Sequence, residues 1–197
     1  MSETKQPEYL SRSHEMGAET LRINGDVKIP DGEIVRSSLV VFGDLTAGAN
    51  TSFLGSLYVQ GNLRLGELTS VAESIHCEGN VLIGGQARIG GAIYCLGVLV
   101  IGKGVQAGLG EKGGGVVCKS DLYVEQEFTT GRKLEAKRVI TVEKIDPELK
   151  AKLDDERPRP EYRLRQPPVM NETYAERQPT QVVWEKTQHS GNNSLGV

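Results

Sequence analysis

The chain has 197 residues, a length that suits one domain with a hydrophobic core and flanking tails. Its formal net charge of −3 gives no basic field that would indicate nucleic-acid binding. No apolar run approaches the roughly 18 residues of a transmembrane helix, and the first twenty residues lack the apolar segment of a signal peptide, so we expect a cytoplasmic protein.

Residues 1–20 are polar, and we expect them to form a disordered N-terminal tail. The composition changes at Leu21. Residues 21–145 hold 21 of the 24 glycines but only one proline, Pro30, and they contain as many acidic as basic residues. This neutral, glycine-rich segment is therefore the predicted folded domain.

Residues 21–145 are organised by two nested periods. Glycine recurs every 18 residues, as does an aliphatic residue four positions earlier; the two series are Gly25, Gly43, Gly61, Gly79 and Gly97, and Leu21, Leu39, Leu57, Ile75 and Ile93. A period of six lies within the period of 18, and it places apolar residues at fifteen successive positions: Ile23, Ile29, Val35, Val41, Ala47, Phe53, Val59, Leu65, Val71, Cys77, Ile83, Ile89, Cys95, Ile101 and Ala107. In a chain that is 38% hydrophobic, such a series does not arise by chance.

A six-residue period indicates short strands separated by bends, because the face of an α-helix recurs every 3.6 residues instead. Three such units make one triangular coil of 18 residues, and successive coils stack about 4.8 Å apart. We therefore predict an all-β protein, a single-stranded three-faced β-helix (solenoid) of six to seven coils over residues 21–145. The bends are expected at the Gly-Asp and Gly-Asn pairs, because glycine accepts a positive φ and Asp or Asn bonds to nearby backbone.

One interruption breaks the 18-residue period. A shift of 23 residues aligns Cys118 with Cys95 and Val124 with Ile101, so five extra residues near 110–115 are expected to loop out of one corner. A further step of 18 places three more residues in the same inward files: Ala136, Ile140 and Val142.

The sequence offers little catalytic chemistry. His76 is expected at an outward surface position between Ile75 and Cys77, and Cys77, Cys95 and Cys118 are expected as small apolar core residues. The segment GEKGGG (110–115) lacks the spacing of a phosphate-binding loop. We therefore predict no catalytic residue, no cofactor and no metal site.

Residues 146–197 are predicted to form a short helix followed by a disordered tail rich in proline and arginine. Asp146 can cap a helix over 146–156, and Pro147 suits its first position. Leu149 and Leu153 share one helical face, which we expect to fold over the open end of the last coil. The tail beyond is either solvated chain or a polyproline-II-like segment that docks protein partners.

The middle segment resembles the bactofilins, a family of polymer-forming bacterial cytoskeletal proteins. The resemblance covers residues 21–145 and rests on the turns GDV (25–27), GDL (43–45), GNL (61–63) and GNV (79–81). It implies a right-handed β-helix that polymerises end to end without nucleotide, and a cytoplasmic scaffold that localises partners in cell shape, wall growth or polarity. Many members contact the membrane through a short apolar or basic N-terminus; MSETKQPEYL is neither, so membrane association stays open.

Both ends of a β-helix expose unpaired backbone groups and core side chains. The residues expected to form the polymer interface are Leu21, Ile23, Val27 and Ile29 at one end, and Phe128, Ile140 and Val142 at the other. Two alternatives remain. The hexapeptides at 83–88, 89–94 and 101–106 also fit a left-handed β-helix acyltransferase, and the β-helix could instead be a rigid spacer for a partner-binding tail.

Overall fold

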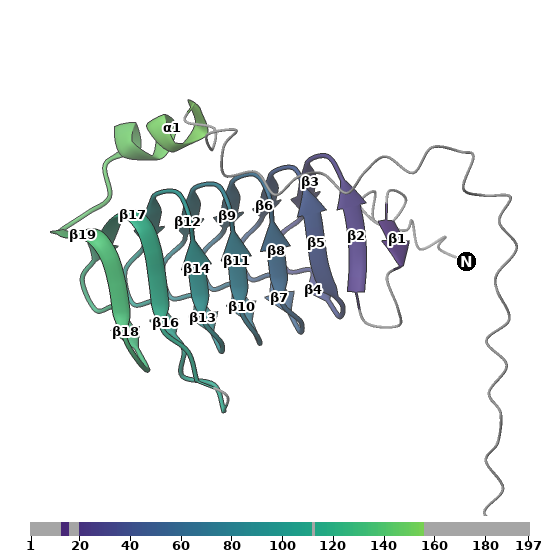
Figure 1. Cartoon of the computed structure of the whole chain (residues 1–197), viewed down its shortest axis with the longest axis horizontal. Helices are drawn as coiled ribbons and strands as arrows, with labels where there is room; N and C mark the ends of the chain where they lie inside the picture. Colours follow the sequence, from purple (N-terminus) through teal and green to yellow (C-terminus); the bar gives the residue numbers. More distant parts are fainter. Residues whose placement is uncertain (1–12, 16–19, 112, 156–197) are drawn as a thin grey trace, which may run out of the picture. The chain divides into compact units, whose positions relative to one another are not determined.

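The computed structural model describes residues 13–15, 20–111 and 113–155. Of the predicted N-terminal tail (1–20), these residues include only Ser13–Glu15 and Thr20, and the predicted disordered tail after residue 156 lies outside them. The described chain forms a β-solenoid of about seven turns, as the 18-residue period predicts (Figure 1).

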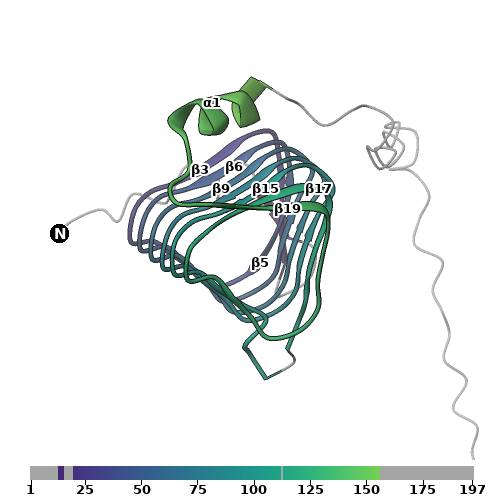
Figure 2. The same cartoon turned by 90° about the vertical axis from the view of Figure 1, so that its left-hand side faces the viewer.

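Three stacks of strands form the three faces of the solenoid (Figure 2). The first face contains β2 (Thr20–Asn24), β5 (Ser38–Phe42), β8 (Leu57–Val59), β11 (Ile75–Cys77) and β14 (Ile93–Cys95). The second contains β3 (Val27–Ile29), β6 (Leu45–Ala47), β9 (Leu63–Leu65), β12 (Val81–Ile83) and β15 (Leu99–Ile101). The third contains β4 (Ile34–Val35), β7 (Ser52–Phe53), β10 (Ser70–Val71), β13 (Arg88–Ile89), β16 (Gln106–Ala107) and β18 (Thr129–Thr130).

Two longer strands, β17 (Val116–Glu125) and β19 (Leu134–Val142), run across the first and second faces without a break. Within each face the strands are parallel and in register with the strand one coil earlier. In Figure 2 the C-terminal coils face the viewer and the chain runs anticlockwise from the β5 face to the β6 face. The solenoid is therefore right-handed.

The core follows the six-residue series. All fifteen residues from Ile23 to Ala107 are buried, with no more than 3% of any side chain exposed. Strands alternate inward and outward positions, so the inward residues of successive coils stack into continuous apolar files. The sequence prediction of the core is confirmed over these coils.

The corner after each strand of the first face depends on glycine, but not for the predicted reason. Gly25, in the first coil, has a φ of 93°, whereas the later members of the series do not adopt a positive φ. In Gly43, Gly61, Gly79 and Gly97, a Cβ would instead lie within 3 Å of the backbone of the glycine one coil earlier. Close contact between stacked coils, not turn conformation, therefore requires these glycines.

The residue after each of these glycines forms a hydrogen-bonded ladder between coils. The Oδ1 atom of Asp26 accepts from the backbone N–H of Asp44 at 2.9 Å, and the Oδ1 of Asp44 accepts from Asn62 N–H at 2.8 Å. Asn62 and Asn80 continue the ladder to Val98, each at 2.9 Å. The Gly-Asp and Gly-Asn pairs thus satisfy corner N–H groups that have no strand partner.

The predicted insertion is confirmed. Val116 pairs with Ile93 and Leu122 with Leu99, a shift of 23 residues, and the extra residues between β16 and β17 project from one corner (Figure 2).

The register predicted for the last coil is wrong after Ala136. Lys119 and Ser120 of β17 lie opposite the single residue Lys137 of β19, which is a β-bulge. A one-residue shift exchanges the two faces of a strand. Ile140 and Val142 consequently pair with the outward residues Tyr123 and Glu125, while Val139 and Thr141 take the inward positions.

Helix α1 (Pro147–Asp155) confirms the predicted helix and its cap, since the Oδ1 of Asp146 accepts from Glu148 N–H at 2.8 Å. Its predicted position over the open end is wrong. The helix lies along the outside of the second face (Figures 1 and 2). There Ile145 and Leu153 are buried against a cluster that includes Val100, Leu82, Val98, Tyr123, Val142 and Leu149. Burial of apolar side chains in this outward strip therefore holds the helix against the second face.

Candidate functional site: the ends and outer faces of the β-helix

The C-terminal end of the solenoid is open. Among the described strands, β19 has a neighbour, β17, on one side only, and β18 likewise pairs only with β16. Leu134, Ala136 and Phe128 pack on the core but are only partly buried. Val139, the next inward residue of β19, is 51% exposed. This end therefore presents a free strand edge together with an uncovered apolar surface.

The N-terminal end differs. β1 (Ser13–Glu15) runs antiparallel to β2 and covers its outer edge, with Ser13 opposite Ile23 and Glu15 opposite Leu21. Leu21 is half-buried, and Ile23, Val27 and Ile29 are at most 3% exposed. Among the described strands, β3 and β4 have one neighbour each. At this end, the backbone edges of β3 and β4 are available for contact with another molecule, whereas the side chains of Ile23, Val27 and Ile29 are not.

The seven predicted interface residues differ in exposure and in the direction in which they point. Phe128 lies at the open end, Leu21 is accessible in part, and Ile23, Val27 and Ile29 belong to the buried core. Ile140 and Val142 point outward, and Val142 packs near helix α1. The 18-residue period does not predict that Val139 faces inward, because the bulge opposite Lys137 carries no periodic signal.

Charged pairs join the outer side of the last two strands. Arg138 donates to both oxygens of Asp121, with Nε 2.8 Å from Oδ1, and lowers the pKa of that carboxyl by hydrogen bonding. Glu135 pairs with Lys133 at 2.9 Å and with Lys119 at 3.5 Å. These pairs are largely solvent-exposed, so each contributes little to stability.

The outer surface of the first face carries an aromatic ladder. The rings of Tyr58, His76 and Tyr94 stack on successive coils, with centroids 5.0 Å and 4.8 Å apart. His76 is therefore half-buried between two rings rather than a free surface residue. Burial lowers its pKa from 6.5, and the nearby Glu78 carboxylate opposes that shift.

Glu78 lies beside this ladder. Only 3% of its surface is exposed. Its Oε1 accepts a short hydrogen bond from the Tyr58 hydroxyl, and its Oε2 has no hydrogen-bond partner among the described residues. Burial and the Glu78 carboxylate together raise the pKa of Tyr58. No periodic or motif signal singled out Glu78.

The three cysteines stack in one inward file, as predicted. Cys77, Cys95 and Cys118 are at most 1% exposed and free, and each thiol lies within hydrogen-bond distance of backbone carbonyl oxygens. Burial raises the pKa of the Cys77 thiol to about 12. Their environment is that of small core residues.

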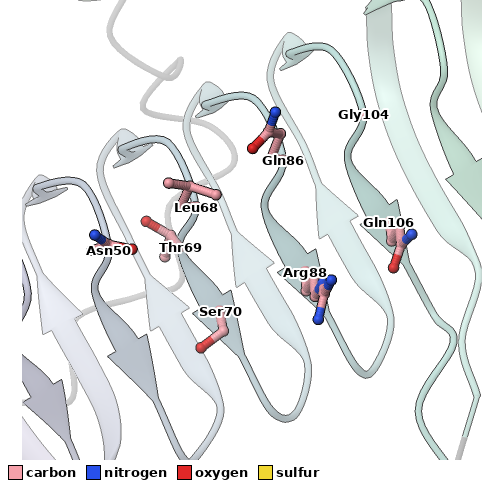
Figure 3. Close-up of a pocket in the computed structure, with 8 residues that line it drawn as sticks. All are labelled: Asn50, Leu68, Thr69, Ser70, Gln86, Arg88, Gly104 and Gln106. Carbon is pink, nitrogen blue, oxygen red and sulfur yellow. The ribbon is translucent and has the colours of Figure 1, made fainter.

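An open groove of about 400 Å³ lies on the third face (Figure 3). The residues that line it come from four successive coils: Asn50, Leu68, Thr69, Ser70, Gln86, Arg88, Gly104 and Gln106. His76 lies on another face and does not line this groove. Within residues 13–15, 20–111 and 113–155, no group of His, Cys, Asp or Glu is arranged to hold a metal ion.

Comparison with family models, with curated proteins and with solved structures found no match. Among the helices of the described residues, none is long and apolar enough to cross a membrane.

Proposed function

We propose that the protein is a non-enzymatic scaffold of the bactofilin type, which assembles end to end into filaments without nucleotide and localises partner proteins. The observation that carries this proposal is the open C-terminal coil. There Val139 is 51% exposed beside the partly buried Phe128, Leu134 and Ala136, along the free edge of β19.

The free strand edge and the exposed apolar surface at this end both favour association with another copy of the chain. An unpaired strand edge is a template for further strand pairing, and burial of apolar area contributes about 25 cal/mol per Å². The folded segment carries equal numbers of acidic and basic residues, so copies of it do not repel one another strongly. The free edges of β3 and β4 at the other end are available to continue a stack.

Sedimentation velocity and negative-stain microscopy of Val139→Arg test the proposal. At tens of micromolar, a range in which weak specific contacts populate complexes, we expect wild-type protein to form filaments. Val139→Arg should fold normally but sediment as monomers or dimers, because the arginine would lie desolvated in the junction.

Leu68→Arg is the matched control. Leu68 is 50% exposed, close to the exposure of Val139, but it lies in the third coil, away from both ends. It should assemble like the wild type. A folded wild-type protein that stays monomeric, or Val139→Arg filaments indistinguishable from those of the wild type, would overturn the proposal.

A further inference from the structure

The N-terminal end of the solenoid is covered on one face and open on the other two. β1 pairs with β2 and covers its outer edge, whereas the edges of β3 and β4 at the same end are free among the described strands (Figure 1). A second copy that stacks on this end can pair with β3 and β4 directly. It reaches the edge of β2 only after β1 has left that edge.

The pairing of β1 with β2 differs from the pairing inside the solenoid. It is antiparallel, whereas β2, β3 and β4 pair in parallel with the strands of the next coil. It joins three residues to a strand of five. Ser13, His14 and Glu15 have no apolar side chain, so hydrophobic burial adds little to this contact. The backbone hydrogen bonds of one short strand therefore hold β1, and the net contribution of such bonds is modest.

The short connection between the two strands keeps β1 in place at low protein concentration. Only residues 16–19 separate β1 from β2. A connection of this length gives β1 an effective concentration on the order of millimolar at the edge of β2. A second copy at micromolar concentration displaces β1 only if it makes more contacts than β1 does. It meets that condition, because it can pair with β2, β3 and β4 at once.

We propose that β1 is a displaceable cap and that the edge of β2 beneath it is a docking surface for a second copy of this chain. The inference rests on the proposed end-to-end assembly and adds its regulation. β1 and a second copy compete for the same edge, so only a protomer whose cap is open completes the contact. The apparent affinity is reduced by the fraction of protomers that are open. The cap therefore sets the protein concentration at which filaments appear.

The double substitution Ser13→Pro and His14→Pro in the full chain tests the cap. Neighbouring residues of an antiparallel strand direct their N–H groups to opposite sides, so one of these two N–H groups faces β2, and proline has none. If about a tenth of wild-type protomers are open, an ordinary population for a minor state, filaments should appear at about one-tenth of the wild-type concentration. Sedimentation and negative-stain microscopy measure this threshold. Ser2→Pro with Glu3→Pro places the same prolines outside β1 and should assemble like the wild type.

A disulfide across the strand pair tests the opposite change. His14 lies opposite Arg22, and the Cα separation of about 4.5–5.5 Å in an antiparallel pair suits a disulfide. The native Cys77, Cys95 and Cys118 are buried, so they do not compete for the bond. When oxidised, the protein with His14→Cys and Arg22→Cys should need at least about tenfold more protein to form filaments than when reduced. Addition of a reductant should restore assembly.

The results distinguish the cap from assembly itself. Filaments of the double-proline protein that appear at the wild-type concentration or above it would overturn the cap and leave assembly standing. Equal assembly of the oxidised and reduced cysteine proteins, with the disulfide formed in the first, would do the same. The absence of filaments from the wild type and the double-proline protein alike would overturn the assembly proposal and the cap with it.

Discussion

Gly61→Ala tests the close contact between stacked corners. A Cβ at Gly61 would lie 2.6 Å from the carbonyl oxygen of Gly43, one coil earlier, and closer still to the Oδ1 of Asp44. The Gly43 oxygen is part of the backbone and cannot move aside without shifting the coil. The Asp44 carboxylate accepts the Asn62 N–H at 2.8 Å, so its displacement would also break one step of the corner ladder.

The expected loss combines two effects. Overpacking against a fixed backbone costs about 1–3 kcal/mol. A corner N–H that loses its acceptor costs about 1–3 kcal/mol more. Together they amount to about 2–6 kcal/mol, a large part of an ordinary total stability of about 5–15 kcal/mol. At about 2–4 °C per kcal/mol for a chain of this size, Tm should fall by about 5–20 °C.

Thermal unfolding followed by circular dichroism measures this loss, with Gly85→Ala as the control. At Gly85 an added Cβ would lie 3.1 Å from the carbonyl oxygen of Lys103 and 3.9 Å from the amide nitrogen of the same residue. Gly85→Ala should therefore change Tm by no more than about 3 °C, since the smaller entropy of the unfolded chain offsets mild crowding. If Gly61→Ala unfolds at the same temperature as Gly85→Ala, close contact between coils does not explain the regular 18-residue spacing of these glycines.

Two further predictions concern the sides of the solenoid. Because burial lowers the pKa of His76 below 6.5, the unfolded chain binds this proton more readily than the folded chain does. The contribution of neutral His76 to stability is therefore complete above the unfolded pKa and is lost as pH falls from there through the folded pKa. The decrease in Tm from about pH 8 to about pH 5.5 should accordingly be smaller in His76→Gln, and an identical decrease would contradict the burial argument. Leu153 is 5% exposed under helix α1, so Leu153→Asp should release the helix, which is too short to persist alone, while the β-helix stays folded. Hydrogen exchange of the Pro147–Asp155 amides should then become much faster, and unchanged protection would show that this leucine does not hold the helix; Ala151→Asp, at an exposed position, should leave the exchange unchanged.

Most of the fold could be predicted from the sequence, because a solenoid repeats one local solution. Each coil buries its inward residues against the next, so every coil must carry an apolar residue at the same place. The spacing from Ile23 to Ala107 therefore gave the strand positions, the core and the coil length, and the shift of 23 residues located the corner insertion. The cap of helix α1 was also predictable, since Asp146 and Pro147 act within a single turn.

The candidate sites depended on the tertiary structure. The bulge opposite Lys137 results from the way β17 and β19 pair, and it moved the exposed apolar position from Ile140 and Val142 to Val139.

Non-periodic contacts were equally invisible to the sequence. Helix α1 packs on the apolar strip around Val100 and not on the open end of the coil. The side chains of that strip come from several different coils, so the sequence does not show that they lie together. Glu78 is buried because it lies at a corner of the coil, beside the aromatic ladder, where the Tyr58 hydroxyl donates to it. Periodicity reports what every coil shares, and the repeat alone therefore determined the solenoid and its core. What occurs once, at an end or at a corner, is fixed by contacts between residues distant in the chain, and only the tertiary structure decided it.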